Sequence, residues 1–158
     1  MRFVDNMQIV VKDAVGAAAT AFQTATASVD MSGWQKCAAV LVLTQAGAGT
    51  ATVTLKQGTT STAATALAFS KYYKNETGVT TAALTEVVAT TLTTAGAATA
   101  TNVYVFEIKA EDLNVDDGYR FVRMDVASIS TNTAAALFYI LYNGDFKGNY
   151  ESLIDGAS

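Results

Sequence analysis

Hydrophobic and polar residues alternate along several short segments of the chain. In Thr50–Lys56, Ala, Val and Leu occupy every second position, and Thr and Lys occupy the positions between them. This period of two is typical of a β-strand that buries one face. The segments Val103–Lys109 and Tyr119–Val126 alternate in the same way, so they predict two more half-buried strands.

The segment Ala134–Tyr142 differs, because its side chains are apolar on both faces of an extended strand. Such a pattern is typical of a strand that is covered on both sides. The segment is therefore predicted to be a central strand covered on both sides, or one whose outer face meets another subunit.

Four further segments are predicted to be strands because they are rich in β-branched or large apolar residues: Gln8–Lys12, Cys37–Thr44, Leu67–Tyr72 and Thr85–Leu92. Gly, Asn and Asp residues between the segments favour turns. About eight short strands at this spacing predict an all-β chain that folds as a single antiparallel β-sandwich, a jelly-roll-like domain. For Ala14–Ala27 the main alternative is an Ala-rich helix, which its Thr and Gly residues disfavour.

The predicted domain boundaries follow from this pattern. Residues 1–13 are expected to form an N-terminal arm or an edge strand, and residues 14–142 the β-sandwich. Residues 143–158 are expected to form a C-terminal arm, because Phe146 and Tyr150 are spaced apolar groups in a polar, Gly-containing context. Such an arm docks on another surface; a frayed terminus is the alternative.

The composition excludes many enzyme mechanisms. The 158 residues include no His, which removes the usual general base at neutral pH and the commonest metal ligand. The single cysteine, Cys37, lies in an apolar run without a His or a second Cys to act with, so it is predicted to be a buried, inert thiol. We therefore expect neither an enzyme nor a bound cofactor.

The charge pattern argues against two classes of partner. The formal net charge is −4 and the basic residues are scattered, so nucleic-acid binding is not expected. No apolar stretch reaches the roughly 20 residues of a membrane span, and the first residues lack the long apolar region of a signal peptide. Binding to a membrane is therefore not expected either.

Three long stretches carry no charge at all. The segments between Lys36 and Lys56, between Glu86 and Glu107, and between Asp125 and Asp145 each contain about twenty uncharged residues. A small monomer normally distributes charge over its surface. Because the cores of protein interfaces are depleted of charge, these stretches predict closely packed subunits. The alternative is a bias in amino-acid composition that has no structural role.

One acidic segment has the spacing of a cation-binding loop. Asp112, Asn114, Asp116 and Gly118 alternate as in a calcium loop, but such a loop closes with Glu, and Arg123 stands at that position. Solvated acids in a turn are therefore predicted, with no metal site. The same segment, Leu113–Tyr119, has the layout of a tyrosine corner, in which the phenol hydroxyl bonds to backbone upstream.

Aromatic residues are the candidates for recognition. Trp34 follows a Ser-Gly turn, and Tyr72 and Tyr73 lie between two lysines. Together with Phe146 and Tyr150 they form the predicted interface set. For Trp34 a role in the core or an interface is favoured, with carbohydrate stacking as the alternative.

The order of three segments resembles a known family. The segments Ala68–Tyr73, Val105–Leu113 and Gly118–Met124, together with the strand pattern from about residue 30, are similar to capsid decoration (cement) proteins of tailed bacteriophages. The resemblance implies a β-sandwich or jelly-roll subunit, commonly a homotrimer, that binds the outside of the phage head and clamps neighbouring major capsid proteins. No functional residue set follows from it.

The sequence thus predicts a structural virion protein. The expected partners are the major capsid protein and other copies of the chain, and the expected location is the capsid surface after synthesis in the host cytoplasm. A tail-tube or head-completion subunit is one alternative. A carbohydrate-binding β-sandwich module that uses Trp34, Tyr72 and Tyr73 is the other.

Overall fold

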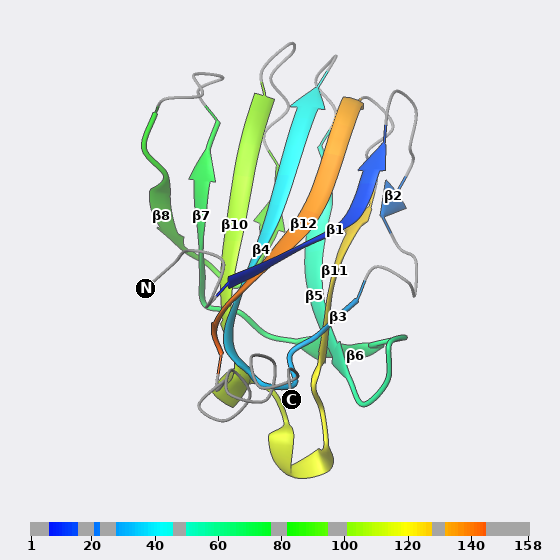
Figure 1. Cartoon of the computed structure of the whole chain (residues 1–158). Helices are drawn as coiled ribbons and strands as arrows, with labels where there is room; N and C mark the ends of the chain where they lie inside the picture. The colour runs from blue at the N-terminus through cyan, green and yellow to red at the C-terminus, as the bar shows by residue number, and fades with distance from the viewer. Residues whose placement is uncertain are drawn as a thin grey trace, which may run out of the picture.

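The computed structural model describes residues 7–15, 21–22, 28–45, 50–76, 82–94, 101–127 and 132–144, which form two antiparallel sheets (Figure 1). Sheet A contains, in order, β1 (Met7–Val15), β12 (Asn132–Gly144), β4 (Trp34–Gln45), β10 (Thr101–Lys109), β7 (Lys71–Asn75) and β8 (Thr85–Val88). Sheet B contains β2 (Ala21–Phe22), β11 (Phe121–Ala127), β5 (Thr52–Gly58) and β6 (Thr65–Leu67), while β3 (Val29–Asp30) pairs with β11 and β9 (Leu92–Thr93) with β5.

The pairing order is that of a jelly roll. Four pairs are nested along the chain: β1 with β12, β2 and β3 with β11, β4 with β10, and β5 with β6. The pairs alternate between sheet A and sheet B, so the chain behaves as one long hairpin rolled into a sandwich. The predicted all-β antiparallel sandwich is confirmed.

The structure describes twelve strands where about eight were expected. The difference has two sources. Two of the predicted strands are each divided into two, and the short strands β2 and β3, which both pair with β11, were not predicted.

Two predicted strands are each divided between the sheets. Leu67 lies in β6 of sheet B, but Tyr72 lies in β7 of sheet A, and both side chains are in the core. Residues five apart in a continuous strand face opposite sides, so the chain must break between them. The predicted strand Thr85–Leu92 is likewise divided into β8 and β9.

The alternative helix over Ala14–Ala27 is wrong for its described residues. Ala14 and Val15 belong to β1, and Ala21 and Phe22 form β2, while the other positions lie outside the described residues. The described part of the chain does contain two single-turn 3₁₀ helices, η3 (Ala110–Asp112) and η4 (Val115–Asp117).

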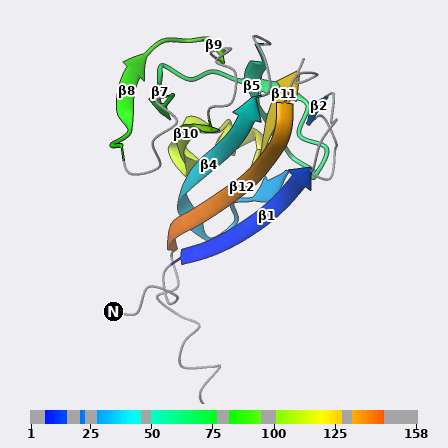
Figure 2. The same cartoon turned by 90° about the horizontal axis from the view of Figure 1, so that it is seen from above.

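The core lies between the two sheets, which Figure 2 shows as layers seen from above. The alternation predicted for three strands is confirmed, because every second residue of each is apolar and buried. These residues are Ala51, which precedes β5, Val53 and Leu55 of β5, Tyr104, Phe106 and Ile108 of β10, and Val122, Met124 and Val126 of β11.

One buried hydrogen bond connects the sheets. The backbone N–H of Met124 in β11 donates to the phenol oxygen of Tyr139 in β12 over 2.8 Å. Met124 lies between the stretch of β11 that pairs with β3 and the stretch that pairs with β2. Tyr139 therefore supplies an acceptor where neither edge strand pairs, and burial raises the pKa of its hydroxyl.

The predicted tyrosine corner is wrong, because the Tyr119 hydroxyl does not bond to backbone upstream. The hydroxyl of Tyr119 lies 3.2 Å from the hydroxyl of Thr65 in β6, so it bonds a side chain of a distant strand and not nearby backbone. The preceding turn is closed by backbone bonds instead, with the N–H groups of Tyr119 and Asp117 both donating to the carbonyl of Asn114. Gly118 takes a positive φ of 76° there, a conformation that favours glycine.

We expect Tyr139→Phe to lower the free energy of unfolding by about 1–3 kcal/mol, because it leaves the buried Met124 N–H without an acceptor. Tyr142→Phe on the same strand is the matched control. Its hydroxyl donates to Glu107 at an exposed position, so its loss is expected to cost about 0.5 kcal/mol or less. Urea unfolding of both variants measures the difference, and equal losses would contradict the assignment.

Candidate interaction surface

The three uncharged stretches of the sequence come together in sheet A. The first stretch begins with most of β4, the second ends with most of β10, and the third contains all of β12. β4 pairs with β12 along one edge and with β10 along the other. Three adjacent strands are therefore uncharged over most of their length.

The register of sheet A places the outward side chains of these strands in rows. Phe138 stands between Leu137 and Tyr139, which are both buried in the core, so it points to the outer face. From the β1 edge to the β8 edge, one row of directly paired residues runs Val11, Phe138, Val40, Val105, Tyr73 and Glu86. Five of its six residues are apolar or aromatic.

Neighbouring rows extend this apolar surface, which we call the neutral face. It consists of the outward residues of four strands: Ile9 and Val11 of β1, Ala136, Phe138 and Ile140 of β12, Ala38, Val40 and Val42 of β4, and Val103 and Val105 of β10. The described strands of sheet B pack against the other side of sheet A, opposite the neutral face (Figure 2). Ile9 and Val11 are 55% and 67% exposed, whereas Val40 is only 7% exposed and the other residues of the face are partly buried.

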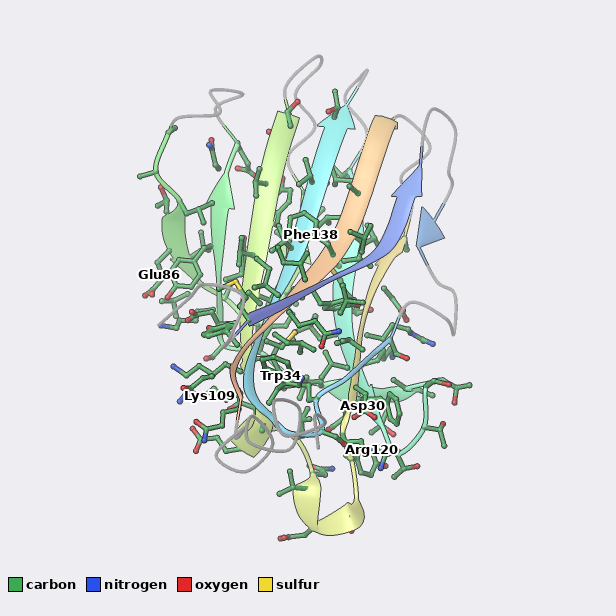
Figure 3. All side chains as sticks on the ribbon, in the orientation of Figure 1. Asp30, Trp34, Glu86, Lys109, Arg120 and Phe138 are labelled. Carbon is green, nitrogen blue, oxygen red and sulfur yellow. The ribbon has the colours of Figure 1, made fainter. Side chains whose placement is uncertain are left out.

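Charged residues lie at the margin of the neutral face. Figure 3 shows Phe138 near the middle of sheet A, with Glu86 and Lys109 toward its borders. Lys71 and Glu86 form an ion pair of 3.0 Å, in which the lysine lowers the pKa of the Glu86 carboxyl. The Tyr142 hydroxyl donates to Glu107 over 3.1 Å. The margin thus carries both signs of charge, largely paired.

A groove of about 360 Å³ adjoins this margin. Its lining includes Lys36, Lys71, Lys109, Glu107 and Asp112. Lys71 and Lys109 are already ion-paired, the latter with Glu111 at 2.9 Å. Because carboxylates offset most of the lysine charge, the groove does not form a positive patch for an anionic ligand.

The predicted aromatic candidates are separated by the fold. Tyr72 is only 6% exposed, and its ring packs against Phe69 and Phe106 at centroid distances of 6.4 and 5.7 Å. The expectation that Tyr72 and Tyr73 act together at a surface is therefore wrong, because neighbours in a strand face opposite sides. Tyr73 is half-buried in the row of Phe138, so it borders the neutral face.

Trp34 begins β4 and packs against the edge of the core, which agrees with the favoured role. The backbone N–H of Trp34 donates to the carbonyl of Met31 and closes the turn in which Gly33 takes a φ of 77°. Phe146 and Tyr150 lie outside the described residues.

Sequence reasoning missed the residues of β1 on this surface. Ile9 and Val11 pair directly with Ile140 and Phe138, so they continue the same apolar rows. The available signal was the alternation of Ile9 and Val11 with Gln8 and Val10, but that pattern alone does not show which face is outward. The pairing with β12 decides it.

The acidic turn has structural roles. One Asp112 carboxylate oxygen accepts the backbone N–H of Lys109 over 2.9 Å and caps η3, while Asp116 and Asp117 are exposed. Within the described ranges, no three acidic or cysteine side chains gather in a group that could hold a metal ion. No helix in the described part of the chain is long and apolar enough to cross a membrane.

Comparison of the chain with protein-family models, with curated proteins and with solved structures finds no match. The assignment of a function therefore depends on the residues and geometry described above.

Cys37 is buried in the core, as predicted, and burial raises its pKa from 9.0 to about 12. The unfolded chain loses this proton near pH 9, but the folded chain keeps it until about pH 12. We therefore expect the free energy of unfolding to fall as the pH rises between these values, by about 1.4 kcal/mol per pH unit for this group.

Urea unfolding between pH 7 and 11 measures this effect. Cys37→Ala should show a shallower decline above pH 9 than the unmodified chain, since tyrosines such as Tyr142 contribute to both. Below pH 8 the two curves should run parallel. Parallel curves over the whole range would contradict the assignment.

Proposed function

We propose that this protein is a structural virion protein, a capsid decoration protein that binds the outer surface of a phage head and stabilises it. The observation that carries the proposal is the neutral face. Three uncharged stretches of the sequence form adjacent strands whose outward residues are apolar, as in the core of a protein interface.

The jelly-roll order of the strands agrees with this role, since the architecture is frequent among viral capsid domains. The energetics of the proposed role are simple. A protein that binds only the assembled shell stabilises the shell by mass action. Many symmetric copies also act together, so each copy needs only a modest contact. The major capsid protein and other copies of the chain are the proposed partners.

A carbohydrate-binding role is not proposed, because one member of its aromatic set, Tyr72, is in the core against Phe69 and Phe106. A tail-tube subunit differs from a decoration protein in the shape of its assembly. Electron microscopy of the purified protein separates the two, because a tail subunit forms rings or tubes.

We expect the purified protein to co-sediment saturably with expanded phage heads that lack it. Unassembled capsid protein is the matched control and should not retain the chain. Decorated heads should release their DNA at a higher temperature than bare heads, in proportion to occupancy. Dye-detected DNA release and quantitative gel analysis measure both effects. Failure to co-sediment at micromolar concentration would refute the proposed function.

A further inference from the structure

We propose that Lys74 and Asn102 form an isopeptide bond within the chain, with Glu76 as the general base of the reaction. The three residues lie on or next to the adjacent strands β7 and β10, on the side of sheet A that faces the core. The inference goes beyond the proposed function and does not require binding to a capsid. It is argued from the register of the two strands, the burial of Asn102 and the contacts of Glu76.

The strand register brings Lys74 and Asn102 to the same side of sheet A. Lys74 is directly paired with Tyr104, which is fully buried in the core. Directly paired residues share a face, so Lys74 points inward. Asn102 precedes Tyr104 by two residues in β10 and therefore also points inward. Residues in this diagonal relation have Cβ atoms about 7–8 Å apart or somewhat closer, a separation that a long side chain such as lysine can span.

Asn102 supplies a buried amide for this reaction. It is 0% exposed and is directly paired with Leu43, which is also fully buried. Asn75 is the neighbour of Lys74 in β7, but neighbours in a strand face opposite sides. The Asn75 amide donates to the carbonyl of Ala82 over 3.2 Å. Of these two amides, Asn102 is the one on the same face as Lys74.

Glu76 is placed to move protons at the reacting amine. One of its carboxylate oxygens contacts Nζ of Lys74, and the other accepts the hydroxyl of Tyr104 over 2.8 Å. The side chains of Lys74 and Glu76 are only 33% and 19% exposed. Transfer of a proton from the ammonium to the carboxylate leaves both groups neutral, which the partial removal of water favours. The neutral amine is then a nucleophile.

The reaction needs no external reagent. Nζ of Lys74 attacks Cγ of Asn102, so a new C–N bond forms. Glu76 delivers the proton that it took from the ammonium to Nδ2 of Asn102, and it then accepts a second proton from Nζ. The Cγ–Nδ2 bond breaks, its electron pair stays on nitrogen, and ammonia leaves with the second proton as ammonium. Nothing is oxidised or reduced, and the chain loses one NH₃, about 17 Da.

The bond would secure the edge of sheet A. β7 pairs with β10 only between Tyr73–Asn75 and Val103–Val105, and β8 is held through β7. A covalent link across this short pairing also closes residues 74–102 into a loop, which restricts the unfolded chain as a disulfide does. Since Cys37 is the single cysteine, the chain cannot form a disulfide within itself. The reaction occurs once per chain, so it is not enzymatic turnover.

The test is the intact mass of the full chain, measured after the protein has folded. Lys74→Arg removes the proposed nucleophile, and Lys71→Arg is its matched control. Lys71 lies on the same strand and pairs with Glu86 at 3.0 Å, but it is three residues from Lys74 and faces outward, with 48% of its side chain exposed. Glu86→Gln is likewise the control for Glu76→Gln. Circular dichroism confirms that each variant is folded.

We expect the unmodified chain, Lys71→Arg and Glu86→Gln to have a mass about 17 Da below that of the sequence. Lys74→Arg and Asn102→Ala should keep the full mass. Glu76→Gln should form the bond at least about a hundredfold more slowly, because a general base contributes roughly 10²–10⁴-fold.

Peptide mapping of the unmodified chain keeps the inference testable if a variant does not fold. Trypsin should not cleave after Lys74, because its amine has become an amide. Tandem mass spectrometry should instead find a branched peptide that joins Lys74 to Asn102.

Three results would overturn the inference. The first is the full sequence mass for the unmodified chain after several days in the folded state. The second is a tryptic map in which Lys74 and Asn102 lie in separate, unbranched peptides. The third is a loss of about 17 Da that persists in Lys74→Arg, which would come from another reaction, such as ring closure at Asn143–Gly144. The measurement uses no phage heads, so its outcome is separate from that of co-sedimentation.

Discussion

The antiparallel pairing of β12 with β4 is the contact on which the other features of this structure depend. It joins segments about a hundred residues apart, and its register decides which side chains enter the core. Leu137 and Tyr139 face inward, whereas Phe138 faces outward between them. A slip of one residue would exchange the two faces. The buried bond from Met124 to Tyr139 and the composition of the neutral face are both consequences of this register.

Much of the fold could be predicted from the sequence because alternation is a local property. The buried sets of β5, β10 and β11 are visible as every second residue, and no distant partner is needed to identify them. The apolar character of Ala134–Tyr142 on both faces also predicted a central strand or one that meets a subunit. The structure places β12 between β1 and β4, with sheet B on one side only.

What could not be predicted depends on contacts between distant segments. The division of Leu67–Tyr72 between two sheets follows from the burial of both ends, which requires a change of face within five residues. The partner of the Tyr119 hydroxyl is Thr65, and only the pairing of the strands brings the two residues together. The inclusion of Ile9 and Val11 in the neutral face likewise depends on the register with β12. A single sequence contains none of these pairings explicitly.

The absence of charge from the neutral face is not required by the fold itself. An outward position on sheet A accepts charge readily, since Lys36 of β4 and both Glu107 and Lys109 of β10 are outward residues of the same strands. Charge at outward positions also keeps a sheet soluble and discourages association. The middle of three adjacent strands nevertheless carries Val, Ala, Ile and Phe where charge would be tolerated. Because nearly all of the buried core is supplied by the inward residues, the outward apolar rows are the feature from which contact with another molecule is proposed.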